Sequence, residues 1–237
     1  MILDPRSVPV WRVDHDLPAI APVHLSADAL RTRFAHPPVW QPEVVQEPRF
    51  TQRAPAQAAV LLAIVPRGPQ GSAPTVLLTQ RTQHLSTHSG QIAFPGGKRD
   101  DTDPSLEATA LRETHEEIGL HPRHVDILGS LPVYVTGTAF CVTPVVGLVQ
   151  PDFELQPNAD EVDDVFEVPL DFLMNPAHHR RHHFEWEGRQ RQWFSMPYKE
   201  SRPDAQGELE HIERFIWGAT AGMLRNFYRF LAANPVP

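Results

Sequence analysis

The sequence predicts an α/β domain in which helices and a sheet form a sandwich. Short strands rich in Val, Leu and Ile begin near residue 57, a helix with readable ends follows near residue 104, and further strands precede an amphipathic C-terminal helix. This order of strand, helix, strands and helix is typical of an α/β sandwich. With 237 residues, 41% of them hydrophobic, the chain can bury the core of one large domain with extensions.

The first 56 residues are expected to form an N-terminal arm or cap and not a separate core. The prolines of the sequence are concentrated here, and they flank one helical stretch, "SADALRTRFA" (26–35), which a Ser or Asp cap opens. We therefore place the domain boundary between a proline-rich arm, 1–56, and a folded domain, 57–237.

The sheet is expected to begin with two paired strands. "QAAVLLAIV" (57–65) and "TVLLTQR" (75–81) are short apolar runs, and the Pro/Gly linker "PRGPQGSAP" separates them. A loop, 82–103, follows them. The next helix has Asp103 at the expected N-cap, Pro104 at the first helical position and Gly119 just past its end.

The second half of the chain adds strands and a last helix. "VDILGSLPVYV" (125–135), "FCVTPVVGLV" (140–149) and "DDVFEVPL" (163–170) have strand character. "HIERFIWGATAGMLRNFYRFLAA" (211–233) predicts a strand that leads into an amphipathic helix.

Composition excludes some partners. A formal net charge of -8 argues against a broad nucleic-acid or anionic-lipid surface, because both need clustered Lys and Arg. No apolar run has the length of a membrane span, and the N-terminus does not resemble a signal peptide. The one cysteine, Cys141, cannot form an internal disulfide, which fits a cytoplasmic location.

Three carboxylates share one stripe of the helix that follows the loop. At about 100° per residue, Glu116 lies about 60° to one side of Glu113 and Glu117 about 40° to the other. Leu111 and Ile118 fall on the opposite side, which is expected to pack against the sheet. A solvated acidic face is the simple interpretation. The Gly-Gly turn in front of the helix favours a cradle for a hard divalent cation instead.

The segment "GGKRDDTDPSLEATALRETHEEIGL" (96–120) resembles the Nudix hydrolase box. The match is nearly complete from Arg112 to Leu120. Upstream the segment is one residue longer than the usual box, and Pro104 stands at the position of the box's first glutamate, with Asp103 as the nearest acid. The resemblance implies an α/β/α sandwich around a mixed β-sheet, with 57–237 as the Nudix domain.

The same resemblance implies roles for the box residues. Glu113, Glu116 and Glu117 would ligate Mg²⁺ or Mn²⁺, a glycine carbonyl near Gly96 or Gly97 would add a ligand, and Arg112 would orient Glu113. Beyond the box, Glu161 is the candidate for a further metal ligand or for the base. Its neighbours Asp160, Asp163 and Asp164 are open alternatives. The candidate catalytic residues are thus Arg112, Glu116 and Glu161.

The stretch before the box resembles the coenzyme A pyrophosphatase branch of the family. It carries Leu77, Leu78, Thr79, Arg81, Gly90, Phe94, Pro95, Gly96 and Gly97 at the positions of that signature. The branch often has arginine at the position of Ser86, and Lys98 or Arg99 could supply this charge. The candidate substrate-binding residues are Arg81, for a phosphate contact, with Gly96, Gly97 and Lys98.

This resemblance implies metal-dependent cleavage of CoA, or its acyl or oxidised forms, to 3′,5′-ADP and 4′-phosphopantetheine. A Nudix hydrolase of another nucleoside diphosphate derivative (NAD-like, ADP-ribose, a nucleoside diphosphate sugar or capped RNA) and a non-catalytic nucleotide-binding module are the alternatives. A homodimer would be unsurprising for this fold family.

A histidine-rich stretch, "HHRRHHFEWEGRQRQWF" (178–194), is expected to be an exposed surface turn. Its histidines form two i, i+4 pairs that could bind Zn²⁺ on a helix, which is the less favoured interpretation. Arg180 and Arg181 could instead contact the 3′-phosphate of CoA.

Overall fold

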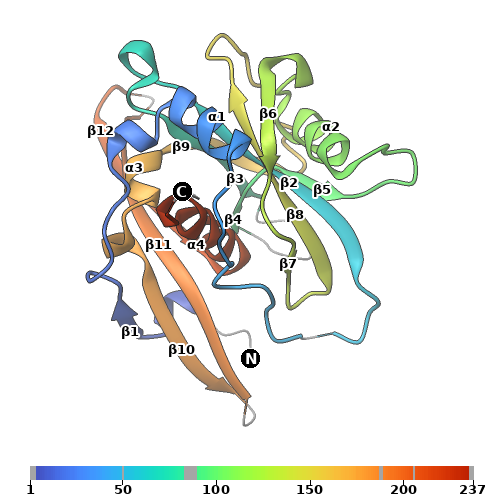
Figure 1. Cartoon of the computed structure of the whole chain (residues 1–237), viewed down its shortest axis with the longest axis vertical. Helices are drawn as coiled ribbons and strands as arrows, with labels where there is room; N and C mark the ends of the chain where they lie inside the picture. Colours follow the sequence, from blue (N-terminus) through green and yellow to red (C-terminus); the bar gives the residue numbers. More distant parts are fainter. Residues whose placement is uncertain (1–3, 50, 83–89, 187–188, 205, 235–237) are drawn as a thin grey trace.

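The computed structural model describes residues 4–49, 51–82, 90–186, 189–204 and 206–234. Two β-sheets and two long helices account for most of this part of the chain (Figure 1). Within these residues, no helix combines the length and the apolar character that crossing a bilayer requires.

The main sheet is mixed. Its strand order is β4-β3-β2-β8-β6, and β5, β7 and β9 pair with β2, β8 and β3, respectively. β2 and β8 run parallel, whereas the other pairs are antiparallel. The strands are β2 (Ala56–Val65), β3 (Thr75–Arg81), β4 (Ile92–Ala93), β5 (Gly96–Lys98), β6 (Val125–Ser130), β7 (Tyr134–Val135), β8 (Phe140–Val149) and β9 (Val162–Pro169).

Helices cover both faces of this sheet. Side chains alternate between the two faces of each strand. One set packs against α2 (Leu106–Ile118), where Leu61 and Leu77 form one cluster with Ala110 and Ile118. The other set, which includes Leu62 and Leu78, packs with α1 (Ala27–Ala35) and α4 (Gly218–Ala232). The predicted α/β/α sandwich around a mixed sheet is therefore confirmed.

A second, antiparallel sheet lies beside α4 (Figure 1). It has the order β1-β10-β11-β12 and consists of β1 (Val10–Val13), β10 (Arg180–Trp186), β11 (Arg189–Pro203) and β12 (Leu209–Trp217). The short α3 (Leu170–Leu173) and five 3₁₀ turns connect the described elements, namely Pro5–Ser7, Pro22–His24, Pro69–Gly71, Pro122–His124 and Pro176–His178.

The predicted surface turn at the histidine-rich stretch is wrong, because residues 180–186 form β10 and residues 189–194 belong to its antiparallel partner β11. His179 and His182 are buried. The ring of His182 bonds to Ser195 Oγ at 2.8 Å, and the ring of His179 bonds to the carbonyl of Leu173 at 2.7 Å. Along an extended strand, residues i and i+4 are too far apart to share a zinc ion in the predicted helical way.

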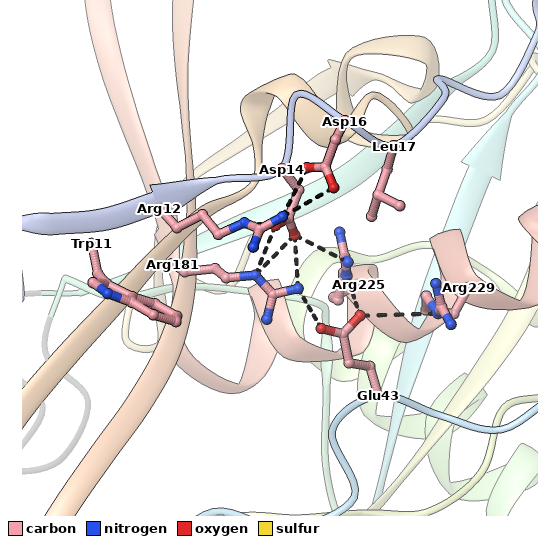
Figure 2. A pocket seen from close by; sticks show the side chains of 9 residues that line it. All are labelled: Trp11, Arg12, Asp14, Asp16, Leu17, Glu43, Arg181, Arg225 and Arg229. Atoms are coloured by element: carbon pink, nitrogen blue, oxygen red, sulfur yellow. Dashed lines mark hydrogen bonds and ion pairs between the residues drawn. The ribbon is translucent and has the colours of Figure 1, made fainter.

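The N-terminal segment is fastened to the second sheet and to α4 by ion pairs, in which Asp14 and Arg225 are buried (Figure 2). Asp14 and Glu43 come from different parts of this segment and bind the same two arginines, Arg181 of β10 and Arg225 of α4. These charges line a hollow of about 420 Å³. Leu25 and Leu30 of the same segment are buried in the α4 side of the core. Ion pairs and apolar packing thus hold this segment against the domain.

Candidate active site

The acidic helix α2 starts later than its sequence indicates. Ser105 is the N-cap, since its Oγ accepts from the amide of Ala108 at 3.1 Å, and Pro104 precedes the helix. The predicted Asp103 cap is therefore wrong. Gly119 ends the helix with φ of 74°, as predicted, in the left-handed conformation that glycine adopts most easily.

Asp103 holds Arg112 instead of capping the helix. Arg112 donates from Nε and Nη2 to the two carboxylate oxygens of Asp103, at 2.9 and 2.8 Å. These hydrogen bonds, with those from the Asp100 amide and Thr109, hold the pKa of Asp103 well below its usual range. Asp103, one residue before the Pro104 that stands where the box has glutamate, is thus bound to an arginine of the box.

The remaining donor of Arg112 faces the acidic stripe. Its Nη1 lies 3.0 Å from Glu113 Oε1 and 2.9 Å from Glu116 Oε2. Arg112 Nη2 also donates to the carbonyl of Lys98 at 3.2 Å, which ties the helix to β5. A guanidinium fixed on one edge by Asp103 can orient the two glutamates on the other.

Glu117 is not part of a solvent-facing stripe. It is 4% exposed and points toward the sheet, next to Ile118, so the predicted separation of acidic and packing faces is wrong for this residue. Its Oε2 accepts from the Gly96 amide at 3.0 Å, and its Oε1 lies 3.5 Å from Arg81 Nη1. Burial raises the pKa of Glu117 to about 7, against the lowering effect of these two donors.

The two glycines let β5 fit between β2 and α2. Gly96 has φ of 147°, and a Cβ on it would lie 2.4 Å from the carbonyl oxygen of Ala59. A Cβ on Gly97 would lie 2.3 Å from Glu113 Oε2. The expected Gly-Gly turn is wrong in form, because both glycines lie in strand β5, but a Cβ at either position would displace β2 or the glutamate.

Glu161 is brought to this centre by a loop that docks on the end of α2. The amides of Gln156 and Asn158 each donate at 2.9 Å to the carbonyls of Ile118 and Glu117, respectively. The carbonyl of Glu161 accepts from the Thr82 amide at 3.1 Å. Burial is the main cause that raises the pKa of Glu113, and the nearby charges of Glu116 and Glu161 add to it.

The three acidic neighbours of Glu161 are placed differently. Asp160 and Asp163 are exposed. Asp164 is paired with Arg214 at 2.5 Å and with Arg202 at 2.8 Å. Burial opposes its ionisation, but these two arginines outweigh burial and lower the pKa of Asp164. An acid held in this way is a poor proton acceptor, which leaves Glu161 as the best placed of the four.

Arg81 ends β3 and Lys98 ends β5. Arg81 is half-buried, and its Nε is a buried donor without a hydrogen-bond partner among the described residues. Lys98 is exposed and lines a shallow hollow of about 380 Å³ together with Ala56, Gln57, Arg99 and Asp101. Ser86 lies in 83–89, outside the described residues.

The donor set fits a hard divalent cation by its chemistry. Carboxylate and carbonyl oxygens are the ligands that Mg²⁺ and Mn²⁺ prefer, and a cation would offset the cost of burying Glu113 and Glu117 together. No group of three or more His, Cys, Asp or Glu in the described ranges is already arranged around one point. Glu113 and Glu116 are turned to Arg112 instead, so sharing an ion requires rotation of these side chains.

The fold brings the glutamates of α2, Arg112, Arg81 and the two glycines together around the start of β5 and the C-terminal half of α2. Glu161 is bound through its carbonyl to Thr82, next to Arg81. Sequence reasoning did not anticipate the docking of residues 156–158, because it depends on backbone contacts that no local motif encodes.

Comparisons with known proteins agree with this geometry. The model of the NUDIX domain matches residues 56–198, more than half of the chain. A relative from Shigella flexneri serotype 5b, an uncharacterized Nudix hydrolase NudL, is 38% identical over 89% of this chain and 97% of its own length. A NudL from Escherichia fergusonii is 42% identical over 76% of this chain and 84% of its own.

Among solved structures, the Nudix hydrolase RenU from M. smegmatis is 28% identical, with a TM-score of 0.42 over 50% of this chain and 73% of its own. The family model covers more than half of the chain, including the acidic helix α2. The two NudL relatives are 38% and 42% identical over most of their own length. The chain belongs to the Nudix hydrolase family.

Proposed function

We propose that this chain hydrolyses the diphosphate of coenzyme A, or of acyl or oxidised CoA, with Mg²⁺ or Mn²⁺. Water adds across the P–O–P bond, giving 3′,5′-ADP and 4′-phosphopantetheine. Family membership supports hydrolysis of a nucleoside diphosphate derivative with a divalent ion. The choice of CoA rests on the signature between Leu77 and Gly97 that precedes the box.

One observation carries the proposal of a catalytic centre. Glu117 is buried, bound to the Gly96 amide, and lies beside Arg81, whose Nε has no hydrogen-bond partner in the described part of the chain. Buried acids and bases with unmet partners are typical of functional sites. A phosphate oxygen at Arg81 would satisfy this donor through a charge-assisted hydrogen bond.

Each residue has a proposed task. Glu113, Glu116 and Glu117 would hold the metal, and a divalent ion there supplies positive charge to the diphosphate. Arg112 orients Glu113 and Glu116. The glycines allow the backbone to approach the ligand closely.

Glu161 is the proposed base. Its carboxylate would accept the proton of the attacking water, and the docked loop, held through Asn158, keeps it beside Glu113 and Glu117. Lys98 is exposed at the C-terminal end of β5 and could contact a peripheral phosphate of the substrate.

Two further properties belong to the proposal. A homodimer and a cytoplasmic location are expected by analogy with the family. Light scattering during size-exclusion chromatography should give twice the 26.7 kDa mass of the chain; a single-chain mass would reject the dimer without affecting the reaction.

A substrate panel tests the proposal. The purified protein is incubated with CoA, acetyl-CoA, NAD, ADP-ribose and a nucleoside diphosphate sugar, with Mg²⁺ or Mn²⁺, and the products are identified by mass spectrometry. Metal-dependent release of 3′,5′-ADP from CoA in preference to the others supports the proposal. Preferential cleavage of another compound would reject CoA, and tight binding without turnover would favour a binding module.

A further inference from the structure

The buried arginine Arg214 of β12 lies across the main sheet from the candidate active site. Its side chain is 2% exposed, and its guanidinium sits 4.1 Å from the ring centroid of Phe166. A buried guanidinium is costly unless its donors are paired. The residues that pair with Arg214 therefore identify what it holds in place.

Arg214 fastens two strands of the main sheet at one rung. Its Nη1 donates to Gln80 Oε1 at 2.8 Å, and its Nη2 donates to Asp164 Oδ2 at 2.5 Å. Gln80 of β3 and Asp164 of β9 are partners in the sheet register. The Nε donates to Glu200 of β11 at 2.7 Å. One side chain of the second sheet thus clamps a strand pair of the first.

Gln80 and Asp164 form the last regular pair of β3 and β9 before a bulge. Gln80 pairs with Asp164, but the next residue, Arg81, pairs with Val162, so Asp163 is the extra residue. A β-bulge re-aims the side chains that follow it. Phe166 packs in the α4 cluster, whereas Val162, also even-numbered, packs in the α2 cluster, so the chain changes face at the bulge.

Arg81 and Glu161, the proposed phosphate contact and the proposed base, are both connected to the Gln80–Asp164 pair. Gln80 and Arg81 are adjacent and point to opposite faces of the sheet, Gln80 to Arg214 and Arg81 to Glu117. Beyond the bulge, Thr82 bonds through its amide to the carbonyl of Glu161.

We infer that Arg214 is a positioning residue, which holds Gln80 and Asp164 on one face of the sheet and thereby fixes Arg81 and Glu161 at the candidate active site on the other. The inference rests on the proposed function and deepens it, because it adds the second sheet to the machinery. Arg214 lies outside residues 56–198, which match the family model. It touches no reacting atom and acts through its two partners.

The chain provides a matched control at the other end of the same strand pair. Arg67 donates from Nε to Glu167 of β9 at 3.0 Å, and Thr75 of β3 donates to the same carboxylate at 2.5 Å. This second arginine–carboxylate clamp holds β3 and β9 far along the strands from Arg81. Its loss should affect stability alone.

The test compares Gln80→Met, Arg214→Met and Arg67→Met with the wild type. For each we would measure kcat/KM on CoA, thermal unfolding, and hydrogen exchange of peptides 77–82 and 156–164. We expect Gln80→Met and Arg214→Met to lower kcat/KM by about 10-fold or more, the usual effect of losing an outer-shell partner, and to speed exchange in both peptides. Arg67→Met should keep kcat/KM.

A double-mutant cycle separates positioning from general stability. If Gln80 acts in part through Arg81, adding Gln80→Met to Arg81→Met should cost less activity than Gln80→Met costs in the wild type. Additive losses, or a Gln80→Met variant with wild-type kcat/KM and exchange, would overturn the inference. Gln80→Met keeps the test valid if Arg214→Met does not fold.

The outcomes also separate this inference from the proposed function. A wild type that cleaves no compound of the panel rejects the proposed function. The inference is then decided by exchange alone: faster exchange of peptide 156–164 in Gln80→Met supports it, and unchanged exchange rejects it.

Discussion

At the scale of single residues, Arg112 links the position where the sequence departs from the box to the glutamates that are proposed to hold the metal. Pro104 stands where the box has glutamate, and Asp103, one residue earlier, binds Arg112 through both carboxylate oxygens. The other edge of the guanidinium reaches Glu113 and Glu116. Asp103 is therefore expected to influence the reaction although it lies behind Arg112.

Replacing Asp103 should lower activity. Asp103→Asn keeps the size of the side chain but removes the charge that fixes Arg112, so kcat should fall by about 10-fold or more, as for other outer-shell partners. Asp100→Asn is the control, because Asp100 is exposed and 4.0 Å from Arg112. Steady-state kinetics on the best substrate checks both variants; equal kcat values in the two would show that Asp103 does not orient Arg112.

Gly97 is predicted to tolerate no side chain. In Gly97→Ala the new methyl group would lie 2.3 Å from Glu113 Oε2 and would push that carboxylate aside. Activity should fall by roughly 100-fold, the cost of misplacing a reacting group by about an ångström. Gly207→Ala serves as the control for activity: a Cβ there meets no atom within 4 Å, and its φ of 85° makes the substitution cost stability and not activity. A fully active Gly97→Ala enzyme would exclude Glu113 from the proposed centre.

At the scale of elements, local pattern predicted much of the Nudix sheet. The run 140–149 coincides with β8 and 75–81 with β3, because uninterrupted apolar residues mark strands buried on both faces. Gly119 ends α2 because its left-handed conformation is a local property.

Elements that depend on distant partners were not predictable. β1 lies in the proline-rich segment and is ordered by pairing with β10, more than 160 residues away. His179 and His182 look like exposed polar residues in sequence, yet Leu173 and Ser195 supply partners that permit their burial. The predicted start of α2 was wrong because the Asp103 carboxylate pairs with Arg112, a contact that only the tertiary structure reveals.

The C-terminal end of α4 depends on Arg33 of α1. Arg33 donates to the carbonyls of Phe230 at 2.7 Å and Leu231 at 2.9 Å, and also to that of Ala233. These are carbonyls that a helix end leaves without partners. Arg33→Met should lower the free energy of unfolding by about 1–2 kcal/mol.

Urea titration checks this prediction, with Arg31→Met as the control. Arg31 is exposed and pairs with Asp28 and Asp126, so its loss should leave the unfolding midpoint unchanged. Equal midpoints for both variants would show that Arg33 does not stabilise the end of α4.

At the scale of the whole molecule, ion pairs join the N-terminal segment, the second sheet and α4. Asp14 and Glu43 meet Arg181 and Arg225 there (Figure 2). Arg225 also donates to His179 Nδ1 at 3.1 Å. The ring must stay neutral to accept this bond, and burial, together with the charge of Arg225, lowers the pKa of His179 to about 4.

His179 should make stability depend on pH. In the unfolded chain it binds a proton below its ordinary pKa of 6.5, whereas the folded ring stays neutral until about pH 4. Its contribution is thus complete above pH 6.5 and declines as the pH falls to 4, by about 3 kcal/mol over this window. Glu117, whose pKa is raised, changes stability in the opposite direction between pH 7 and its unfolded value.

A difference measurement isolates the histidine. Urea unfolding of the wild type and of His179→Gln at several pH values between 4 and 7 removes the common contribution of Glu117. The advantage of the wild type should shrink steadily as the pH falls. A constant difference over this range would show that His179 is protonated equally in the folded and unfolded states.

The most direct test of the central claim is the turnover of CoA by Glu117→Gln under saturating Mg²⁺ or Mn²⁺. The amide keeps the shape of Glu117 and its acceptor oxygen toward Gly96, so the thermal midpoint should stay close to that of the wild type. Because the anionic oxygen that would hold the metal is lost, we predict a fall in kcat of about 100-fold or more, beyond the cost of an outer-shell change. A folded Glu117→Gln enzyme that releases 3′,5′-ADP at the wild-type rate would contradict the assignment of this helix as the catalytic centre.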